Sequence, residues 1–329
     1  MFFEGSSVML TGGTGSFGRA FLAKLLERQK PRRVVIYSRD ELKQYEMKQR
    51  LSGDDHDRIR FFLGDIRDRE RLSMAMRGVD YVVHAAALKQ VDTAEYNPME
   101  FVKTNILGSE NVIQAAISNS VKKVVALSTD KASSPVNLYG ATKLTADKLF
   151  ISSNHLVEAG GTRFAVVRYG NVMGSRGSVI PFFRDKAARN EPLPITDQRM
   201  TRFWITLDQA VQFVIDSFDD MNGGELYVPR IPSMKIVDLA HAIAPDTDFV
   251  EIGVRPGEKM HEEMIAVADA PRTVRREDRY VVAPTLAVWG GYQPPSGDPV
   301  PDDFSYSSDN NDLWLSVDEL RAMLVDLNL

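Results

Sequence analysis

The sequence predicts an α/β fold in which a doubly wound parallel sheet carries a smaller C-terminal α+β lobe. Short runs rich in Val, Ile and Phe alternate with longer amphipathic stretches through the first two-thirds of the chain. This alternation is typical of a parallel sheet with right-handed crossovers. A glycine-rich turn follows the first run, and the alternation stops near Asn171, after which prolines interrupt the pattern. The regular part therefore forms the sheet and the irregular part forms the lobe.

The elements expected from this pattern follow in order along the chain. Buried strands are expected at residues 7–10, 34–37, 59–63, 81–84, 124–128 and 164–168. Helices are expected at 19–29, 42–50, 69–76, 98–119 and 139–159, followed by a helix at 208–218 and a strand at 225–228. The last helix begins at Ser316, because Glu319 completes a capping box with it. A proline-rich connector spans 293–301, and the acidic loop 307–312 is expected to be a solvated surface turn.

The composition is that of an ordinary globular protein and excludes several classes of function. A net charge of −5 argues against general attraction to nucleic acid or anionic lipid. The absence of cysteine excludes disulfides, thiolate metal sites and thiol nucleophiles, and His84 and His261 lack the spacing of metal ligands. No signal peptide opens the chain, and no run reaches the ~20 apolar residues of a membrane span. We therefore expect a soluble cytoplasmic protein without metal, nucleic-acid or membrane partners.

The turn after the first strand has the features of a phosphate cradle. Gly12, Gly15 and Gly18 give the spacing G-x-x-G-x-x-G between a strand and a helix. Such glycines allow a tight turn, close approach of the backbone to a pyrophosphate, and close packing of helix on sheet. Free amides at the helix N-terminus then bind the diphosphate. Ala85 and Ala86, after the fourth strand, are small enough to let a dinucleotide pass, so the pattern predicts a Rossmann-type dinucleotide site.

The end of the second strand bears on the choice of nicotinamide cofactor. An NAD site usually carries a carboxylate there for the ribose 2′-hydroxyl, whereas this chain has Ser38-Arg39-Asp40. Ser38, Arg39 and Lys43 offer donors and positive charge to a 2′-phosphate, which favours NADP. In the alternative, Arg39 is only a surface cation and Asp40 takes the acidic role. Asp65, after the third strand, would lie near the adenine or simply cap its own loop.

A tyrosine and a lysine follow the fifth strand. Tyr139 and Lys143 are four residues apart near a helix start, so their side chains share one face. An ammonium beside a phenol lowers the pKa of the phenol from ~10. Such a tyrosine can take the proton of a sugar hydroxyl while the carbon gives hydride to a nicotinamide. The pair alone would be a packing contact, but its place downstream of a phosphate cradle favours catalysis.

The fifth strand ends in Ser128-Thr129-Asp130-Lys131. Adjacent residues of a strand point to opposite faces, so Asp130 and Lys131 can meet one substrate only if the strand ends before them. The turn residues that follow, Ser133 among them, indicate such an early end. The alternative is a surface ion pair, yet strand ends over the nucleotide crevice are where these sheets place their chemistry.

Together the two pairs predict dehydration of a transiently oxidised sugar. A ketone at one carbon acidifies the neighbouring C–H, so a base can remove that proton while an acid expels a β-hydroxyl as water. Lys131 would be the base and Asp130 the acid. Lys131 would then need a depressed pKa, which burial and the nearby Lys143 would provide.

These residues together resemble the extended short-chain dehydrogenase/reductase family, and within it the inverting UDP-N-acetylglucosamine 4,6-dehydratases. The matching strings are TGGTGSFG, YSRDELKQ, HAAALKQV, STDKA, YGATK, RYGNVMGSRGSVIPFF, MTRFWITL and RPGEK. The resemblance extends from the N-terminus to about Ile265, and its most specific part is Asp130-Lys131, because the retaining dehydratases carry Asp-Glu there. It implies a lyase with a UDP-sugar substrate, in the pseudaminic acid pathway that serves flagellin glycosylation and polysaccharide biosynthesis. It also implies a homo-oligomer, such as a hexamer.

The resemblance further implies roles for individual residues. Tyr139 and Lys143 would run the hydride step at sugar C4, with NADP as cofactor. Asp130 would protonate the departing C6 hydroxyl, and Lys131 would handle the C5 proton. The product would be UDP-2-acetamido-2,6-dideoxy-β-L-arabino-hex-4-ulose, inverted at C5.

Pattern and resemblance together give two sets of candidate binding residues. The cofactor-binding set is Gly12, Thr14, Gly15, Ser16, Phe17, Gly18, Ser38, Arg39, Lys43, Asp65, Ile66, Ala85, Ala86, Ser128, Tyr139, Lys143 and Val172. The substrate-binding set is Lys89, Thr129, Asn171, Arg176, Val179, Arg255 and Glu258.

The expected division of the chain places an NADP-binding Rossmann domain at 1–172, with a return at about 203–230. The substrate-binding lobe would comprise 173–202 and 231–329, within which the Gly- and Pro-rich stretch 283–303 receives no role. Two alternatives stay open: a retaining 4,6-dehydratase or 4-epimerase of a nucleotide sugar, and, more remotely, a non-catalytic NADP-sensing module.

Overall fold

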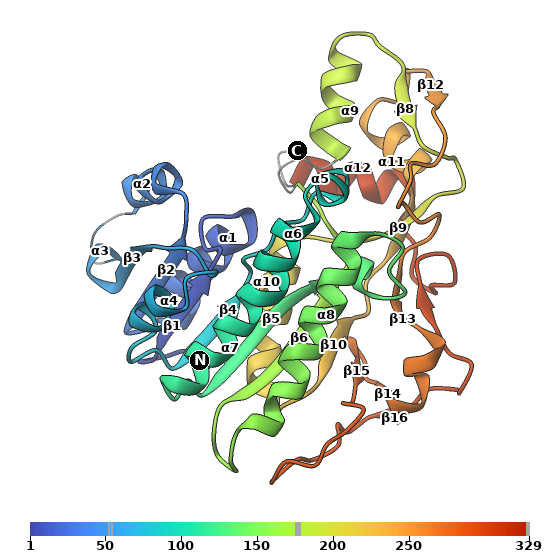
Figure 1. Cartoon of the computed structure of the whole chain (residues 1–329). Helices are drawn as coiled ribbons and strands as arrows, with labels where there is room; N and C mark the ends of the chain where they lie inside the picture. Colours follow the sequence, from blue (N-terminus) through green and yellow to red (C-terminus); the bar gives the residue numbers. More distant parts are fainter. Residues whose placement is uncertain (52, 54, 175–178, 327–329) are drawn as a thin grey trace.

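The computed structural model describes residues 1–51, 53, 55–174 and 179–326 (Figure 1). Within them one large sheet has the strand order β16-β14-β15-β10-β6-β5-β4-β1-β2-β3, and three small sheets form the lobe at one end. From β3 to β10 neighbouring strands are parallel, whereas β15, β14 and β16 add an antiparallel edge. This is the Rossmann-type sheet with a smaller lobe that the sequence predicts.

The strands of the large sheet are β1 (Ser7–Thr11), β2 (Arg33–Ser38), β3 (Ile59–Leu63), β4 (Tyr81–His84), β5 (Lys123–Thr129), β6 (Arg163–Tyr169), β10 (Leu226–Pro229), β14 (Thr273–Arg275), β15 (Arg279–Val282) and β16 (Asp298–Pro299). The small sheets contain β7 (Asn171–Val172), β8 (Leu193–Ile195), β9 (Thr201–Ile205), β11 (Ser233–Lys235), β12 (Phe249–Glu251), β13 (Glu263–Ile265) and β17 (Tyr306–Ser307). Each of the six strands expected before Asn171 is confirmed to within one residue.

The α-helices are α1 (Ser16–Lys24), α2 (Glu41–Gln49), α3 (Asp55–Arg58), α4 (Arg69–Ala75), α5 (Val91–Tyr96), α6 (Pro98–Phe101), α7 (Gly108–Ser118), α8 (Leu138–Ser152), α9 (Val179–Ala188), α10 (Leu207–Asp220), α11 (Ile236–Ile243) and α12 (Val317–Asp326). π-Helical turns η1 (Leu25–Gln29) and η2 (Val102–Leu107) extend α1 and join α6 to α7. Single 3-10 turns are η3 (Asp130–Ala132), η4 (Ser153–Leu156) and η5 (Val267–Arg272).

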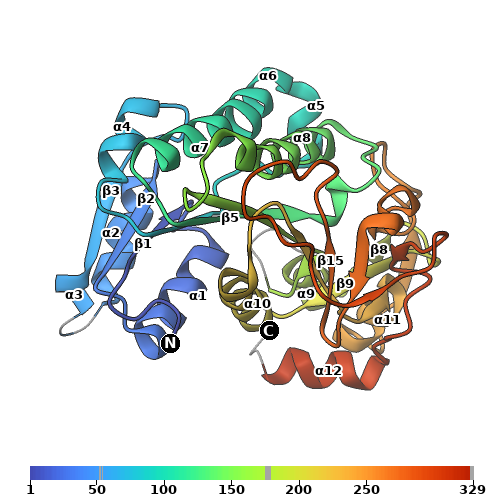
Figure 2. The same cartoon turned by 90° about the horizontal axis from the view of Figure 1, so that it is seen from below.

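Helices cover both faces of the large sheet (Figure 2). α4, α7 and α8 pack side by side on one face, and α1 packs with α10 on the other. Because both faces are covered, the central strands are apolar throughout, and Val125 and Phe164 are fully buried. The chain runs outward from β1 to β3 and then returns to β4 beside β1. That change of direction opens a crevice beyond the carboxyl ends of β1 and β4, the usual binding position in such sheets.

Side-chain caps define several helix starts. The capping box predicted at the last helix is confirmed, because the Ser316 amide donates to Glu319 Oε2 at 2.8 Å and the Glu319 amide donates to Ser316 Oγ at 3.3 Å. The helix expected at 139–159 is too long, since α8 ends at Ser152 and the turn η4 follows. Gly160, in the turn between η4 and β6, has φ 85°, a conformation that favours glycine.

One expectation for the C-terminal part is wrong, and one segment of it joins the large sheet. The loop 307–312 is not simply a solvated turn, because Ser308 and Asn311 are buried and hold the lobe together by hydrogen bonds. Within the stretch 273–299, which the expected division assigns to the substrate-binding lobe, β14, β15 and β16 pair with the large sheet through β10. Short strands of two to four residues broken by Gly and Pro leave little pattern in a sequence. The expected division into two domains stays a prediction.

None of the helices in the described ranges is both long and apolar enough to span a membrane.

Truncation of a core side chain of β6 tests the burial of the central strands. We expect Phe164→Ala to lower the free energy of unfolding by about 3–5 kcal/mol, because it leaves a cavity between sheet and helices. Phe182→Ala on α9 is the control, since this ring is 43% exposed and should cost no more than about 1 kcal/mol. Equal losses in urea denaturation of the two variants would contradict the assigned core.

Candidate active site

A cleft of about 830 Å³ lies at the carboxyl ends of the parallel strands. Every residue of the candidate cofactor-binding set lines it, and so do Asp130 and Lys131. From the substrate-binding set, Lys89, Thr129 and Asn171 line it as well. The cleft therefore gathers residues from six strand ends, as the topological rule for open α/β sheets requires.

The glycine turn fits closely against the end of β4. Gly12 has φ 66°, and a Cβ there would lie 2.9 Å from the backbone of Ala86. A Cβ on Gly18 would collide with the Gly13 carbonyl, so the helix can start this close to the turn only with glycine. Gly15 is the N-cap of α1, and among the described residues no side chain caps that end and no acidic residue occupies its first turn. Its amides point to an anion site.

The end of β2 presents one exposed cation to the cleft. The Arg39 side chain is 51% exposed, with Nη1 3.5 Å from Asp65 Oδ2. Ser38 is buried and its Oγ accepts from Gln44 Nε2 at 3.0 Å. Asp40 is the N-cap of α2: its Oδ1 accepts from the Lys43 amide at 2.9 Å, and its Oδ2 is paired with the Lys43 ammonium. Asp40, the carboxylate that could have taken the acidic role in an NAD site, therefore caps helix α2.

Asp65 caps its own loop while lining the cleft. Its carboxylate accepts from the Arg67 amide and Arg67 Nε, each at 2.9 Å. Burial alone would raise the pKa of Asp65, but the hydrogen bonds and charge of Arg67, aided by Arg39, hold it below its usual value. Of the two roles left open, loop capping is therefore present in this structure.

Tyr139 and Lys143 are both buried on the first turns of α8. The helix begins there because Asn137 is its N-cap and accepts from the Gly140 amide at 2.7 Å. Lys143 Nζ donates to the Leu127 carbonyl at 2.7 Å, and burial lowers the pKa of this lysine.

The expected lowering of the Tyr139 pKa by Lys143 is wrong for this structure. Burial raises the pKa of Tyr139 to about 12, and the cation that opposes this shift is Lys131. Desolvation of a phenolate outweighs one neighbouring charge here, because the phenol is almost wholly enclosed.

Strand β5 ends at Thr129, and the turn η3 begins at the next residue. The early end that the sequence predicts is therefore present. Asp130 is 1% exposed, and its Oδ1 accepts from Thr129 Oγ1 at 2.8 Å and from Lys131 Nζ at 3.1 Å. Asp130 Oδ2 is buried without a hydrogen-bond partner among the described residues. The pair is thus an internal one and not a surface ion pair.

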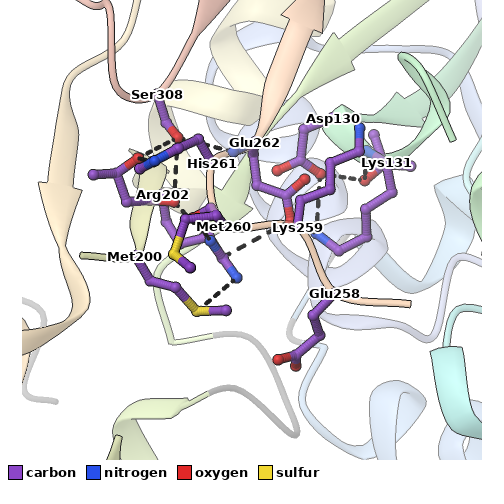
Figure 3. Close-up of polar contacts among 12 residues, drawn as sticks. Asp130, Lys131, Met200, Arg202, Glu258, Lys259, Met260, His261, Glu262 and Ser308 are labelled. Atoms are coloured by element: carbon purple, nitrogen blue, oxygen red, sulfur yellow. Dashed lines mark hydrogen bonds and ion pairs between the residues drawn. The ribbon is translucent and has the colours of Figure 1, made fainter. Parts of the chain in front are cut away.

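Sequence reasoning missed a second carboxylate beside Lys131. Glu262 Oε1 lies 3.0 Å from Lys131 Nζ and 3.8 Å from Arg202 Nε (Figure 3). Burial lowers the pKa of Lys131, but the charges of Asp130 and Glu262 raise it well above its ordinary value. The expected depressed pKa of Lys131 is therefore wrong, because two anions, one of them distant in sequence, flank the ammonium.

The remaining substrate-binding candidates lie elsewhere. Val179 begins α9, and Arg255 and Glu258 form an ion pair at 3.9 Å outside the lining of the cleft. Figure 3 shows Glu258 directed away from Lys131 and its partners. The loop that carries them is tied to α8, since Asn137 Nδ2 donates to the Gly257 carbonyl at 2.8 Å. Arg176 lies outside the described residues.

Comparison with known proteins assigns the family. The profile of a family described as polysaccharide biosynthesis protein matches residues 8–284. An inverting UDP-N-acetylglucosamine 4,6-dehydratase of Campylobacter jejuni is 53% identical over 98% of this chain and 98% of its own. The chain belongs to the polysaccharide biosynthesis protein family. A UDP-glucose 4-epimerase of Rickettsia akari is 43% identical over 81% of this chain and 80% of its own. The X-ray structure of Pen from Bacillus thuringiensis matches with a TM-score of 0.90 at 38% identity, over 99% of this chain and 100% of that one.

The matches support the extended short-chain dehydrogenase/reductase fold of this polysaccharide biosynthesis protein over its whole length, including the part beyond Ile265 where the motif resemblance fades. Further cleft residues belong to neither candidate set: Tyr37, Asp40, Gly64, Ala87, Thr104, Leu127, Tyr169, Gly170 and Leu207. Tyr169 is the last residue of β6 and Gly170 follows it, so the rule of strand ends could have located both.

His84 is a buried structural residue of the protein core. Its Nδ1 lies 2.8 Å from Thr11 Oγ1, and its Nε2 lies 3.2 Å from Ser109 Oγ. Ser109 Oγ donates to the Asn105 carbonyl, so it accepts from Nε2–H, and Nδ1 accepts from Thr11. Burial lowers the pKa of His84 from 6.5 to about 3. Among the described residues, no three His, Cys, Asp or Glu side chains gather as a metal site requires.

The buried neutral His84 predicts a pH-dependent loss of stability. The unfolded chain binds a proton below about pH 6.5 and the folded protein does not, so this contribution is full above that pH and declines toward about pH 3. His84→Asn removes the titration. Its free energy of unfolding should fall less steeply with decreasing pH, by up to about 1.4 kcal/mol per pH unit. Urea denaturation across pH checks this, and parallel curves for the two proteins would contradict it.

Proposed function

We propose that this protein is an NADP-dependent inverting 4,6-dehydratase of UDP-N-acetylglucosamine. The observation that carries the proposal is the placement of Asp130 and Lys131 beside Tyr139 in one cleft with a glycine cradle. The 53% identity to an enzyme of that name over 98% of the chain supports it. By the resemblance, the product would enter pseudaminic acid synthesis for flagellin glycosylation. A cytoplasmic homo-oligomer remains part of the proposal.

The residues present fit a nicotinamide dinucleotide. The uncapped amides at the start of α1 suit the diphosphate, and the close approach of Gly12 to Ala86 leaves the cleft open over the turn. Ser38, Arg39 and Lys43 would surround a 2′-phosphate, and the use of Asp40 as a helix cap supports NADP over NAD. When bound, the nicotinamide supplies a hydride acceptor, later a hydride donor, and a positive charge.

The chain's own groups would then move the protons. Tyr139 takes the proton of the C4 hydroxyl, which a positive charge in the cleft favours against the effect of burial. Lys131 takes the proton of C5, made acidic by the C4 ketone. Asp130, with its unpartnered Oδ2 in the interior, donates a proton to the departing C6 hydroxyl, which leaves as water. A proton returned to the opposite face of C5 inverts that centre.

Product analysis in heavy water tests the reaction. We expect the protein with NADP to convert UDP-N-acetylglucosamine into a 4-keto-6-deoxy sugar that carries solvent deuterium at C5 and the inverted configuration, as read by NMR. Retention at C5 would instead indicate a retaining dehydratase. Simple C4 epimerisation would favour the reaction named for the Rickettsia akari relative, and absence of any turnover would favour a sensing module.

Arg39→Ala tests the cofactor. We expect it to weaken NADP binding by about 2 kcal/mol, roughly 30-fold in Kd, because it removes a charge-assisted contact to the 2′-phosphate. NAD binding should change little. Arg67→Ala is the matched control, since Arg67 also pairs with Asp65 but does not line the cleft. Equal weakening of both cofactors by Arg39→Ala, measured by calorimetry, would contradict the role of Arg39.

A further inference from the structure

Lys131 is held between two buried carboxylates. Its Nζ lies 3.1 Å from Asp130 Oδ1 and 3.0 Å from Glu262 Oε1, with Glu262 only 3% exposed. In Figure 3 the two acids approach the ammonium from different segments of the chain. Lys131 itself is about a quarter exposed and lines the cleft, so it connects the interior carboxylates to the space where a substrate would bind.

Glu262 occupies a fixed position. Its amide donates to Ser308 Oγ at 2.9 Å, and its carbonyl accepts from the Ser308 amide at 2.7 Å. The next residue, Glu263, begins β13, which pairs with β17, and its Oε1 accepts from Ser133 Oγ at 2.7 Å. This contact joins the strand to the loop that follows Lys131. The backbone therefore presents the Glu262 carboxylate to Lys131 independently of any substrate.

The charged groups around Lys131 come from several elements. Asp130 lies on η3, Glu262 precedes β13, and Arg202 on β9 lies 3.8 Å from Glu262. Lys259 also interacts electrostatically with both acids, and the Tyr139 phenol on α8 lies near Lys131. Arg202 is committed to other partners, because its Nη1 donates to the Thr201 and Met260 carbonyls at 2.7 and 3.0 Å.

An ammonium in this setting cannot act as a base until it has lost a proton. Burial lowers the pKa of Lys131, but the charges of Asp130 and Glu262 together raise it above its ordinary value. The amine is therefore protonated at neutral pH. Asp130 has to bring a proton to the C6 hydroxyl and its Oδ1 already accepts two hydrogen bonds. Glu262 Oε2 is buried without a partner among the described residues, so this carboxylate has the capacity to hold one more proton.

We propose that Glu262 is a positioning residue for Lys131 that takes up its proton and thereby prepares the amine to deprotonate C5. The inference deepens the proposed function and rests on it. In the first step an N–H bond of Lys131 breaks and an O–H bond forms on Glu262. In the second, the amine nitrogen takes the C5 proton, and the electrons of the C–H bond form the C5–C6 double bond while Asp130, which enters this step in its acid form, protonates the C6 hydroxyl, which leaves as water. Lys131 contacts both carboxylates, so it then passes a proton to Asp130 and takes back the one held by Glu262, which restores the acid for the next turnover. No external oxidant or reductant is needed.

Glu262→Gln is the direct test, because it keeps the shape of the side chain and removes its ability to accept a proton. Single turnovers of the NADP-loaded enzyme with UDP-N-acetylglucosamine are followed by the absorbance of the reduced nicotinamide. We expect its appearance, which reports oxidation at C4, to change less than twofold. Its decay, which reports elimination and hydride return, should slow on the order of 100-fold near neutral pH.

The pH profile separates a proton-transfer role from a structural one. In the natural protein the decay should be nearly independent of pH above neutrality, because Glu262 supplies the acceptor. In Glu262→Gln only the free amine reacts, so the decay should accelerate with rising pH in proportion to hydroxide until Lys131 is deprotonated. Glu262→Asp retains an acid and should be slower yet show a flat profile.

Glu263→Gln is the matched control, since this neighbouring carboxylate contacts Ser133 and Ser134, whereas the ion pairs of Lys131 within the described residues are with Asp130 and Glu262. It should keep the natural pH profile. If Glu262→Gln does not fold, the rate and pH profile of Glu262→Asp decide, and an unchanged decay in that variant overturns the inference. Equal slowing of both phases at every pH in Glu262→Gln overturns it as well. Absence of a dehydrated product from the natural protein would instead refute the proposed function, and the inference with it.

Discussion

Strand β5 ends at Thr129, and a 3-10 turn begins at the next residue. Asp130 and Lys131 therefore lie outside the pleated strand, which would point consecutive side chains to opposite faces. Asp130 thereby enters the interior while Lys131 reaches the cleft. Helix α8 packs directly on this turn, because Gly140 lies so close to the Lys131 carbonyl that a Cβ would collide with it. The same helix carries Tyr139, so one local break in a strand brings the acid, the amine and the phenol into one volume.

In this site burial shifts the pKa values of the reacting groups more than any one neighbouring charge does. Burial dominates the pKa of Tyr139, whereas two carboxylates together overcome its effect on Lys131. Buried charges are tolerated when they are paired, and here the Lys131–Glu262 pair joins η3 to the residue that precedes β13. Another buried pair, Arg168 with Asp147 at 3.0 Å, fastens β6 to α8, and Asp147 Oδ2 also accepts from Ser128 Oγ, a residue of the cleft lining. The geometry of the reacting groups thus rests on interior electrostatics.

The parallel strands were predictable because each is a short buried run of apolar residues between turn residues, and the strand-end rule then located the glycine cradle and Asp130. Glu262 was not predictable. Its place depends on the pairing of β13 with β17 and on Ser308, contacts between segments that carry no shared periodicity. The raised pKa of Lys131 was missed for the same reason, since only one of its two carboxylates is adjacent in sequence. The edge strands within 273–299 are too short and too rich in Gly and Pro to give a pattern.

Because β14, β15 and β16 return to the large sheet, the lobe segments between β10 and β14 are anchored to that sheet at both ends. A movement of these segments relative to the sheet has to bend the chain at both ends, and the hydrogen bond from Asn137 Nδ2 to the Gly257 carbonyl is a further attachment near the cleft. Wide opening and closing between two bodies would strain these attachments. Because Glu262 lies in this part of the chain, such a movement would also lengthen the 3.0 Å contact between Lys131 Nζ and Glu262 Oε1.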